Sequence, residues 1–237
     1  MFQKAEKKII SSKQIAAAKS MEFINPKKIF GLGTGSTVNF LIHKIHESYI
    51  LKGQPINAVS TSSETTSLAT SLGINIVALD QVDELDVVID GADEVDAENN
   101  LIKGGGGALL MEKIVASCSK QFIIIVDSSK IVSNLGKFPL PVEVVQFGSE
   151  KIKASIERFL ISLGYQTPKV TFRRSASNKY VTDQQNYILD LHLNEILDPK
   201  TLSIGLLQIV GVVEVGLFID MASKIIIGND DGSCKVI

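Results

Sequence analysis

Residues 86–113 hold the side chains best suited to acid–base chemistry in this chain. An apolar run leads directly into two acids, Asp90 and Asp93, and further on Lys103 precedes four successive glycines. The glycines expose amide N–H groups, and a helix that begins in this run would direct the positive end of its dipole to the same place. Glu112, one or two turns into that helix, should point back toward the glycines because helical side chains lean toward the N-terminus. A base aimed at an oxyanion site predicts catalysis.

Simpler explanations exist for each of these residues. Asp90 and Asp93 could form only a turn and a helix cap, and a glutamate such as Glu112 commonly complements the helix dipole. Two neighbouring acids could instead bind Mg²⁺, but a lysine and a glycine nest at the same place would compete with a cation. We therefore expect no metal. The apolar stripe predicted for the helix consists of Leu110, Ile114 and Cys118, which leaves Glu112 on a face of small residues.

A second glycine-rich loop, Gly33 to Thr37, follows a predicted strand at 28–32. Together with Gly31, its glycines Gly33 and Gly35 have the spacing GxGxG rather than the GxGxxG of dinucleotide sites, and residues 61–63 offer hydroxyls where such a site needs an acid. The loop therefore favours a phosphate or sugar hydroxyls, unless its residues only cap helices and permit turns. Because ligands of parallel sheets lie beyond the carboxyl ends of the strands, this loop and Asp90 should share one rim.

Strands and helices alternate through the first half of the chain, which predicts an α/β fold with a parallel sheet covered by helices. An opening helix should end near residue 25. Strands are expected at 28–32, 56–61, 74–78, 87–89 and 122–126, with helices after the first glycine loop, at 64–72 and after the second glycine loop.

The pattern changes beyond residues 137–141 to that of a small α+β unit. Its expected elements are strands at 142–146, 167–173, 187–192 and 211–217 and helices at 150–163 and 200–208. A last strand at 224–227 is expected to return to the first sheet.

Composition excludes several classes of protein. The 237 residues carry a net charge of −2, and the pair Arg173–Arg174 is isolated and best explained as a solvated turn, so we expect no nucleic-acid partner. Cys118 and Cys234 lack the spacing of a zinc site or a disulfide framework. No run approaches the roughly 18 apolar residues of a membrane span, and the N-terminus is unlike a signal peptide. These features predict a cytoplasmic protein that does not bind membranes.

Taken together, the motifs resemble those of the ribose-5-phosphate isomerase family of the A type over nearly the whole chain. The segments that carry the resemblance are GLGTGSTVNFLI, DVVIDGADEVD, IKGGGGALLMEKIVA, VDSSK and GKFPLPVEV, followed by EILDP and GVVEVGLF. The resemblance implies interconversion of D-ribose 5-phosphate and D-ribulose 5-phosphate in the non-oxidative pentose phosphate pathway, without a metal or an organic cofactor.

The resemblance also implies the architecture. It predicts a Rossmann-like domain with helices on both faces of a parallel sheet, formed by residues 1–135 and 215–237. A smaller ferredoxin-like α+β domain, residues 136–214, is inserted near its end. A homodimer or homotetramer is expected.

Matching the family's motifs residue by residue assigns the site. Glu112 would be the base, with Lys103 and the glycine amides holding the enediolate and Asp90, alone or with Asp93, moving hydroxyl protons. Lys130 follows a predicted strand and would contact the substrate, although a surface lysine after a turn is common. The substrate-binding residues would be Thr34, Gly35, Ser36, Thr37, Asp90, Gly91, Ala92, Asp93, Lys103, Gly104, Gly105, Gly106, Lys130 and Lys13.

The chain departs from the family's pattern in places and leaves an alternative function open. Gly107 stands where alanine is frequent, residues 182–186 lack a common glycine, and Val210 replaces a usual proline. The alternative is a sensor domain that binds a sugar phosphate without turnover, although no helix-turn-helix region precedes the sheet. Acyl-CoA transferases and amino-sugar phosphate deaminases resemble the motifs much less.

Overall fold

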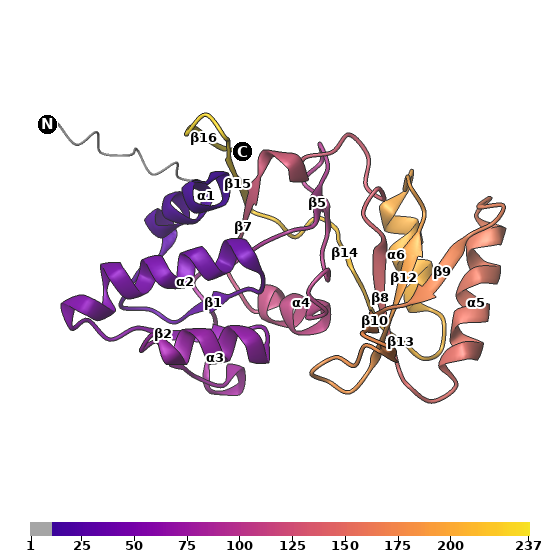
Figure 1. The fold of residues 1–237 in the computed structure, drawn as a ribbon, viewed down its shortest axis with the longest axis horizontal. Helices are drawn as coiled ribbons and strands as arrows, with labels where there is room; N and C mark the ends of the chain where they lie inside the picture. Colours follow the sequence, from indigo (N-terminus) through magenta and orange to yellow (C-terminus); the bar gives the residue numbers. More distant parts are fainter. Residues whose placement is uncertain (1–10) are drawn as a thin grey trace, which may run out of the picture.

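Seven strands form the larger of two main sheets in the computed structural model, which describes residues 11–237 (Figure 1). Their order is β3-β2-β1-β4-β7-β15-β16, and every neighbouring pair is parallel except the last. The first six strands follow the order of a Rossmann sheet. Their bounds are β1 Phe30–Leu32, β2 Asn57–Ser60, β3 Asn75–Ile76, β4 Val88–Asp90, β7 Phe122–Asp127, β15 Lys224–Gly228 and β16 Cys234–Val236.

Helices cover both faces of this sheet, as the sequence predicts. Alternate residues of a strand point to opposite faces, so Ile123 and Ile125 of β7 join one apolar core while Ile124 and Val126 join another. Three helices pack in the first core, namely α1 Ser12–Ser20, α2 Ser36–Ser48 and α3 Ser63–Ser71, and α4 Leu109–Ser117 packs in the second. The expected return of the last segment is also confirmed, because β15 pairs with β7.

Four antiparallel strands in the order β13-β8-β12-β9 form the other main sheet. With two helices they follow the chain as β-α-β-β-α-β, the ferredoxin-like arrangement, and they enclose a third apolar core. The elements are β8 Leu140–Val144, α5 Ser149–Ser162, β9 Lys169–Phe172, β12 Tyr187–His192, α6 Pro199–Leu207 and β13 Val212–Val215. The predicted fold class is confirmed, and the domain boundaries at 136 and 214 stay a prediction.

Several short elements were not predicted, because two or three residues carry no periodic pattern. We call the part of the molecule around the seven-stranded sheet the first lobe and the part around the four-stranded sheet the second lobe. The strands β5 Glu94–Val95, β6 Leu101–Ile102 and β14 Leu217–Phe218 form a small sheet between the two lobes (Figure 1). Pairing of β6 with β14 places the backbone N–H of Lys103 2.9 Å from the carbonyl of Gly216. A hairpin of β10 Arg174–Ser175 and β11 Asn178–Lys179, and 3₁₀ helices at Met21–Phe23, Ile50–Lys52, Leu79–Gln81 and Ser128–Lys130, complete the structure.

Two expectations about helix α4 are wrong. The helix begins at Leu109, after the glycine run rather than within it. The predicted stripe is not its buried side, because Ile114 is 41% exposed and Cys118 is also exposed. The predicted stripe and the buried stripe both repeat at helical spacing, so the sequence alone does not distinguish them. Packing against the sheet buries the stripe that contains Glu112 and Val115. The buried residues are Leu109, Glu112, Val115 and Ala116.

Within residues 11–237, no helix combines the length and the apolar character needed to cross a membrane. The first ten residues of the expected opening helix lie outside the described part of the chain.

Candidate active site

One cavity opens where the predicted site residues meet. Strands β1 and β4 are parallel neighbours, so the loops that follow them share one edge of the sheet, as expected. The cavity is lined by Lys13, Thr34, Gly35, Ser36, Thr37, Gly91, Ala92, Asp93, Lys103, Gly104, Gly105, Gly106, Glu112, Val126 and Lys130. It therefore contains every predicted site residue except Asp90. Val126 was not predicted, because an apolar residue near a strand end gives no chemical signal.

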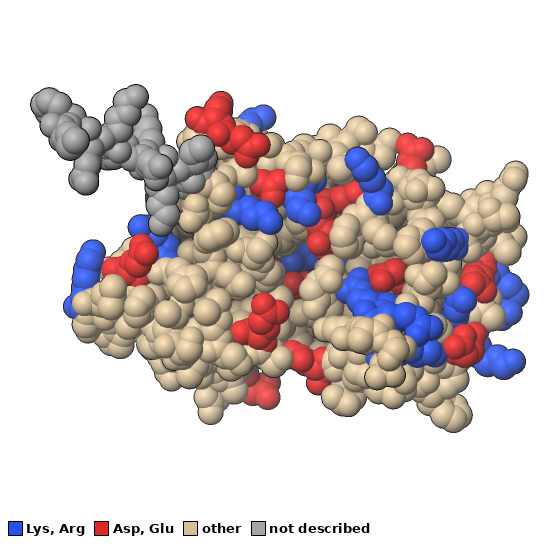
Figure 2. Space-filling view, in the orientation of Figure 1, with Lys and Arg blue, Asp and Glu red and all other residues tan. Residues whose placement is uncertain are grey.

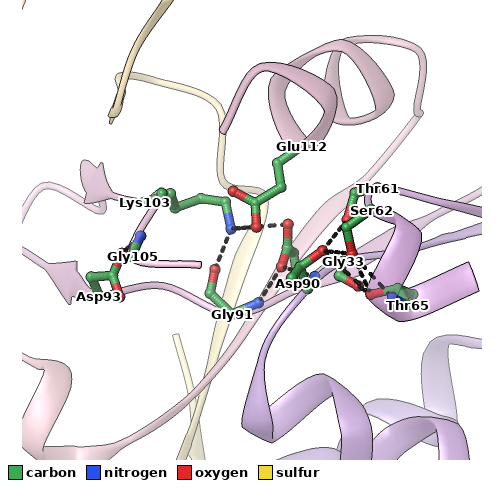
Figure 3. Close-up of polar contacts among 12 residues, drawn as sticks. Gly33, Thr61, Ser62, Thr65, Asp90, Gly91, Asp93, Lys103, Gly105 and Glu112 are labelled. Carbon is green, nitrogen blue, oxygen red and sulfur yellow. Dashed lines mark hydrogen bonds and ion pairs between the residues drawn. The ribbon is translucent and has the colours of Figure 1, made fainter. Parts of the chain in front are cut away.

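A buried lysine joins the two carboxylates at the centre of this site (Figure 3). The Nζ atom of Lys103 lies 2.6 Å from the carbonyl oxygen of Gly91, 2.9 Å from Oδ2 of Asp90 and 3.4 Å from Oε1 of Glu112. The side chains of Lys103 and Asp90 are 2% and 0% exposed. Burial opposes the charge on Lys103, but the carboxylates of Asp90 and Glu112 outweigh it and raise the lysine pKa. Lys103 is therefore a fixed cation that holds both acids.

Asp90 lies beneath the cavity rather than on its surface, which corrects the expectation that it lines the site. Its Oδ1 atom accepts the backbone N–H groups of Thr34 at 3.0 Å and Gly91 at 2.7 Å. A side chain at Gly33 would collide with this carboxylate. Burial raises the pKa of Asp90, and Lys103 and the two N–H groups oppose that effect. Asp90 thus ties the first glycine loop to Lys103, and a role in moving hydroxyl protons stays a prediction.

Glu112 reaches from the first turn of α4 toward Lys103 (Figure 3). Its Oε2 atom is buried and has no hydrogen-bond partner among residues 11–237, and the side chain lines the cavity. Burial, followed by the charge of Asp90, raises the pKa of Glu112 to about 8, while Lys103 opposes the shift. A carboxyl with a pKa near neutrality can both accept and return a proton. The geometry therefore suits Glu112 to the role predicted for it.

The second glycine loop presents fewer free N–H groups than expected. The N–H of Gly105 donates to Oδ2 of Asp93 at 2.7 Å, so it does not face a ligand in this structure. The N–H groups of Gly104 and Gly106 have no partner within the described residues, and both glycines line the cavity. Asp93 is half-buried and also lines the cavity. Asp93 therefore borders the cavity, whereas Asp90 lies beneath it.

The part of the cavity wall at the start of α2 suits an anion. Helix α2 begins at Ser36, and its N-cap Gly35, with φ of 116°, offers no side chain to the free N–H groups of the first turn. Such a helix end attracts negative charge. Lys13 adds a cation there and donates to the Ser36 hydroxyl at 2.9 Å. Lys130, at the end of a 3₁₀ helix after β7, also lines the cavity.

Hydroxyl groups of residues that follow β2 form hydrogen bonds with the first glycine loop. The Thr34 hydroxyl lies 2.8 Å from those of Thr61 and Ser62, and the Thr65 hydroxyl donates to the carbonyl of Gly33 at 2.8 Å (Figure 3). The Thr34 hydroxyl is thus part of the scaffold, although its residue lines the cavity. Of the two hydroxyls predicted as ligands after the second strand, that of Ser62 supports the loop and that of Ser63 donates to Asp183.

The prediction that both adjacent arginines lie in a solvated turn is wrong for one of them. Arg174 is exposed, but the side chain of Arg173 is 14% exposed and contacts the second glycine loop. Among residues 11–237, no group of three or more His, Cys, Asp or Glu side chains could hold a metal ion.

A Rossmann-ordered sheet with a buried carboxylate, a lysine and an anion-binding helix end in one cavity is typical of enzymes that act on phosphorylated substrates. The sequence model of a family described as ribose 5-phosphate isomerase A (phosphoriboisomerase A) matches residues 57–232. The chain belongs to this family.

Relatives and solved structures agree over nearly the full length. The chain is 47% identical to a ribose-5-phosphate isomerase A of Cereibacter sphaeroides, covering 98% of this chain and 93% of the relative. It is 49% identical to that of Streptococcus pneumoniae, covering 93% and 94%. The ribose 5-phosphate isomerase of Plasmodium falciparum superposes with a TM-score of 0.88 at 34% identity, covering 95% and 97%. A D-ribose-5-phosphate isomerase in complex with phospho-erythronic acid gives 0.87 at 38%, with the same coverage.

Proposed function

We propose that this chain interconverts D-ribose 5-phosphate and D-ribulose 5-phosphate through an enediolate, as a step of the non-oxidative pentose phosphate pathway. The observation that carries the proposal is the side chain of Glu112, which lines the cavity with its Oε1 atom 3.4 Å from the buried lysine and its Oε2 atom without a hydrogen-bond partner among residues 11–237. Family membership supports it. So does the relative bound to phospho-erythronic acid, whose carboxylate resembles an enediolate in placing two oxygens side by side.

Glu112 performs the two carbon-bound proton transfers in this proposal. Its carboxylate takes the proton from C2 of the open-chain aldose, and the C–H electron pair forms the C1–C2 double bond while the carbonyl oxygen O1 gains charge. The same carboxyl returns the proton to C1 as O2 becomes the new carbonyl and its proton moves to O1. A pKa of about 8 suits both directions, because the base must accept the proton and also release it.

Lys103 and the glycine loop stabilise the charge that develops on O1 and O2. Each preorganised donor of this kind contributes roughly 3 kcal/mol to the transition state. The N–H groups of Gly104 and Gly106, which have no partner among residues 11–237, are the backbone donors in this proposal, and Lys103 can exchange one of its three protein contacts for a substrate oxygen. Asp93, which lines the cavity, and the buried Asp90 transfer protons among the hydroxyls and assist ring opening.

The phosphate of the substrate binds at the start of α2. Lys13, the hydroxyl of Ser36 and the N–H groups of the first helical turn supply a cation and donors there, and Lys130 contacts the substrate from the 3₁₀ helix that follows β7. This division leaves the phosphate at one end of the cavity and the reacting carbons at Glu112.

We further propose that the protein acts as a homodimer or homotetramer in the cytoplasm and binds no nucleic acid. Phe147 and Val210 are each 94% exposed next to adjoining strand ends, which favours burial by another copy. Acidic and basic side chains are intermingled on the face in Figure 2, without a broad basic field. Two free cysteines are consistent with a reducing compartment.

Conversion of ribose 5-phosphate in D₂O with EDTA present tests the function and the mechanism together. We expect turnover that EDTA does not reduce and deuterium at C1 of the ribulose 5-phosphate, because Glu112 exchanges its proton with solvent. Absence of turnover would favour the sensor alternative. Turnover without any deuterium at C1 would contradict exchange of the Glu112 proton with solvent, and sensitivity to EDTA would contradict a metal-free reaction.

A further inference from the structure

The second lobe reaches across to the catalytic glycine loop through one arginine. Arg173, which follows β9, donates from Nη1 to the carbonyl oxygens of Gly104 at 2.6 Å and Gly105 at 2.9 Å. Its other edge forms a two-pronged pair with Asp190 of β12, Nε to Oδ2 at 3.1 Å and Nη2 to Oδ1 at 2.5 Å. The planar guanidinium is therefore fixed at both edges, which a lysine could not reproduce.

Fixing two carbonyls also fixes the direction of two N–H groups. In a trans peptide unit the C=O and the following N–H point in opposite directions. When Arg173 holds the carbonyls of Gly104 and Gly105, the N–H groups of Gly105 and Gly106 must point away from it. The first meets Asp93 at 2.7 Å, and the second has no partner among the described residues and belongs to a residue that lines the cavity.

Four successive glycines cannot hold this direction by themselves. Glycine populates more backbone conformations than any other residue, so a peptide unit between two glycines can turn over at little steric cost. With the peptide between Gly105 and Gly106 reversed, a carbonyl oxygen rather than an N–H would face the substrate and would repel the enediolate. An external contact must therefore select the productive orientation.

A second residue of the same lobe supports the loop at its end. The hydroxyl of Tyr180 lies 3.3 Å from the carbonyl of Gly106, and a side chain at Gly107 would come within 2.5 Å of that hydroxyl. Gly107 has a φ of 83° and carries no side chain. The missing side chain leaves the space that the tyrosine ring occupies.

We infer that Arg173 is a positioning residue for the isomerase reaction: it orients the peptide units of the glycine loop so that the Gly106 N–H faces the enediolate. This role rests on the proposed function. It makes the second lobe part of the catalytic apparatus, although none of its own side chains lines the cavity.

A matched contact between the lobes distinguishes positioning from simple attachment. Asp183 accepts the N–H of Ser63 at 2.8 Å and its hydroxyl at 2.9 Å, and so joins the lobes without touching the glycine loop. Arg174 provides a second control, because it is exposed and donates only to the carbonyl of Ser177 within the described residues. Loss of either contact should leave the loop peptides oriented.

The test compares Arg173→Met and Arg173→Lys with Asp183→Asn and Arg174→Met. We measure kcat and KM for ribose 5-phosphate, and inhibition constants for phospho-erythronic acid and for inorganic phosphate. Removal of a direct oxyanion donor costs about 10²- to 10³-fold in kcat. Because the effect of Arg173→Met is indirect, kcat should fall about 10- to 100-fold. The inhibition constant of phospho-erythronic acid should rise by a similar factor, while that of inorganic phosphate should change by no more than about 2-fold. The kcat of Arg173→Lys and its inhibition constant for phospho-erythronic acid should lie between those of Arg173→Met and of the unchanged protein.

Three results would overturn the inference. In the first, Arg173→Met behaves like Asp183→Asn in all four constants. In the second, both inhibitors weaken equally, which would indicate general loosening of the cavity. In the third, Arg173→Lys keeps full kcat. If Arg173→Met fails to fold, Arg173→Lys and Asp190→Asn decide the question by the same constants. Absence of turnover in the unchanged protein would instead refute the proposed function.

Discussion

The two glycine-rich loops of the cavity are held in opposite ways. The first, residues 33–37, is fixed from within its own lobe by the hydroxyls of Thr61 and Ser62 and by the buried carboxylate of Asp90. The second, residues 104–107, is held through its carbonyl oxygens from the other lobe, and within its own lobe Asp93 accepts the N–H of Gly105. A loop that binds a permanent phosphate charge needs only a rigid donor set. A loop that meets a transient charge must also keep one particular direction of its peptide units.

The lysines near the two loops also differ, in how deeply they are buried and in what they contact. Lys103 is 2% exposed and paired with two buried carboxylates, whereas Lys13 is only partly buried and contacts a serine hydroxyl. Charges buried in a low dielectric interact strongly and shift one another's pKa values, while exposed charges are screened by water. Substitutions around Lys103 should therefore change kcat and the free energy of unfolding, whereas substitutions around Lys13, at the proposed phosphate site, should change substrate affinity.

Replacement of Glu112 by glutamine should have the largest effect on the reaction. Glutamine keeps the shape of the side chain but cannot take a proton from C2, so kcat should fall about 10²- to 10⁴-fold. Binding of ribose 5-phosphate, measured by calorimetry, should stay within a few fold, because the phosphate end is untouched. A Glu112→Gln variant that keeps most of its turnover would eliminate this assignment.

Replacement of Lys103 by methionine should have the largest effect on stability. Asp90 and Glu112 would then be buried without their cation, which costs roughly 3–5 kcal/mol in the free energy of unfolding. Urea denaturation at neutral pH measures the loss. Lys28→Met removes a partner of Asp86 that is 52% exposed, and it should cost about 1 kcal/mol or less.

A double variant, Lys103→Met with Asp90→Asn, should recover part of that stability. It removes the acid whose oxygen lies 2.9 Å from the lysine nitrogen, while Glu112, with a pKa of about 8, is largely protonated at neutral pH. If the double variant is less stable than Lys103→Met alone, burial of uncompensated charge is not the cause.

The pH dependence should separate Glu112 from ordinary carboxyls. Because its pKa is raised from 4.5 to about 8, kcat/KM should rise up to tenfold per pH unit below about 8 and level off above it. The folded state retains a proton that the unfolded chain releases, so this group lowers stability as the pH rises from about 4.5 to 8. Glu112→Gln should remove that part of the slope in urea denaturation, and equal slopes in both proteins would contradict the raised pKa.

The sequence predicted those parts of the fold that repeat a pattern over many residues. The apolar run before Asp90 and the stripe of α2 define buried surfaces by their spacing, so β4 and α2 lie where expected. The strands β6 and β14 consist of two residues each and depend on pairing between residues more than a hundred positions apart, such as Leu217 with Ile102. Local pattern carries no information on such contacts.

The site was predicted in composition but not in contacts. Motifs identified Lys103 and Glu112, and the structure brings them together at 3.4 Å. The full burial of Asp90 and the hydrogen bonds from Arg173 to the glycine loop depend on packing between distant segments. Local sequence does not show such packing, and for this reason it predicts only a solvated turn for the pair of arginines. Arg173 gives a signal only in retrospect, as a charged residue that follows a strand of the second lobe.

The smallest effect is expected at the phosphate end, where Ser36→Ala removes one hydroxyl. The helix N–H groups and Lys13 remain, so KM should rise only about 3- to 10-fold, the value of one hydrogen bond, while kcat stays nearly constant. Steady-state kinetics with ribose 5-phosphate give both constants. Ser63→Ala is the control, since Ser63 begins α3 and contacts Asp183 outside the cavity, and it should leave KM unchanged. A Ser36→Ala variant that loses kcat rather than affinity would mean that the phosphate end also governs the chemical step, and the contrast between the two loops would not hold.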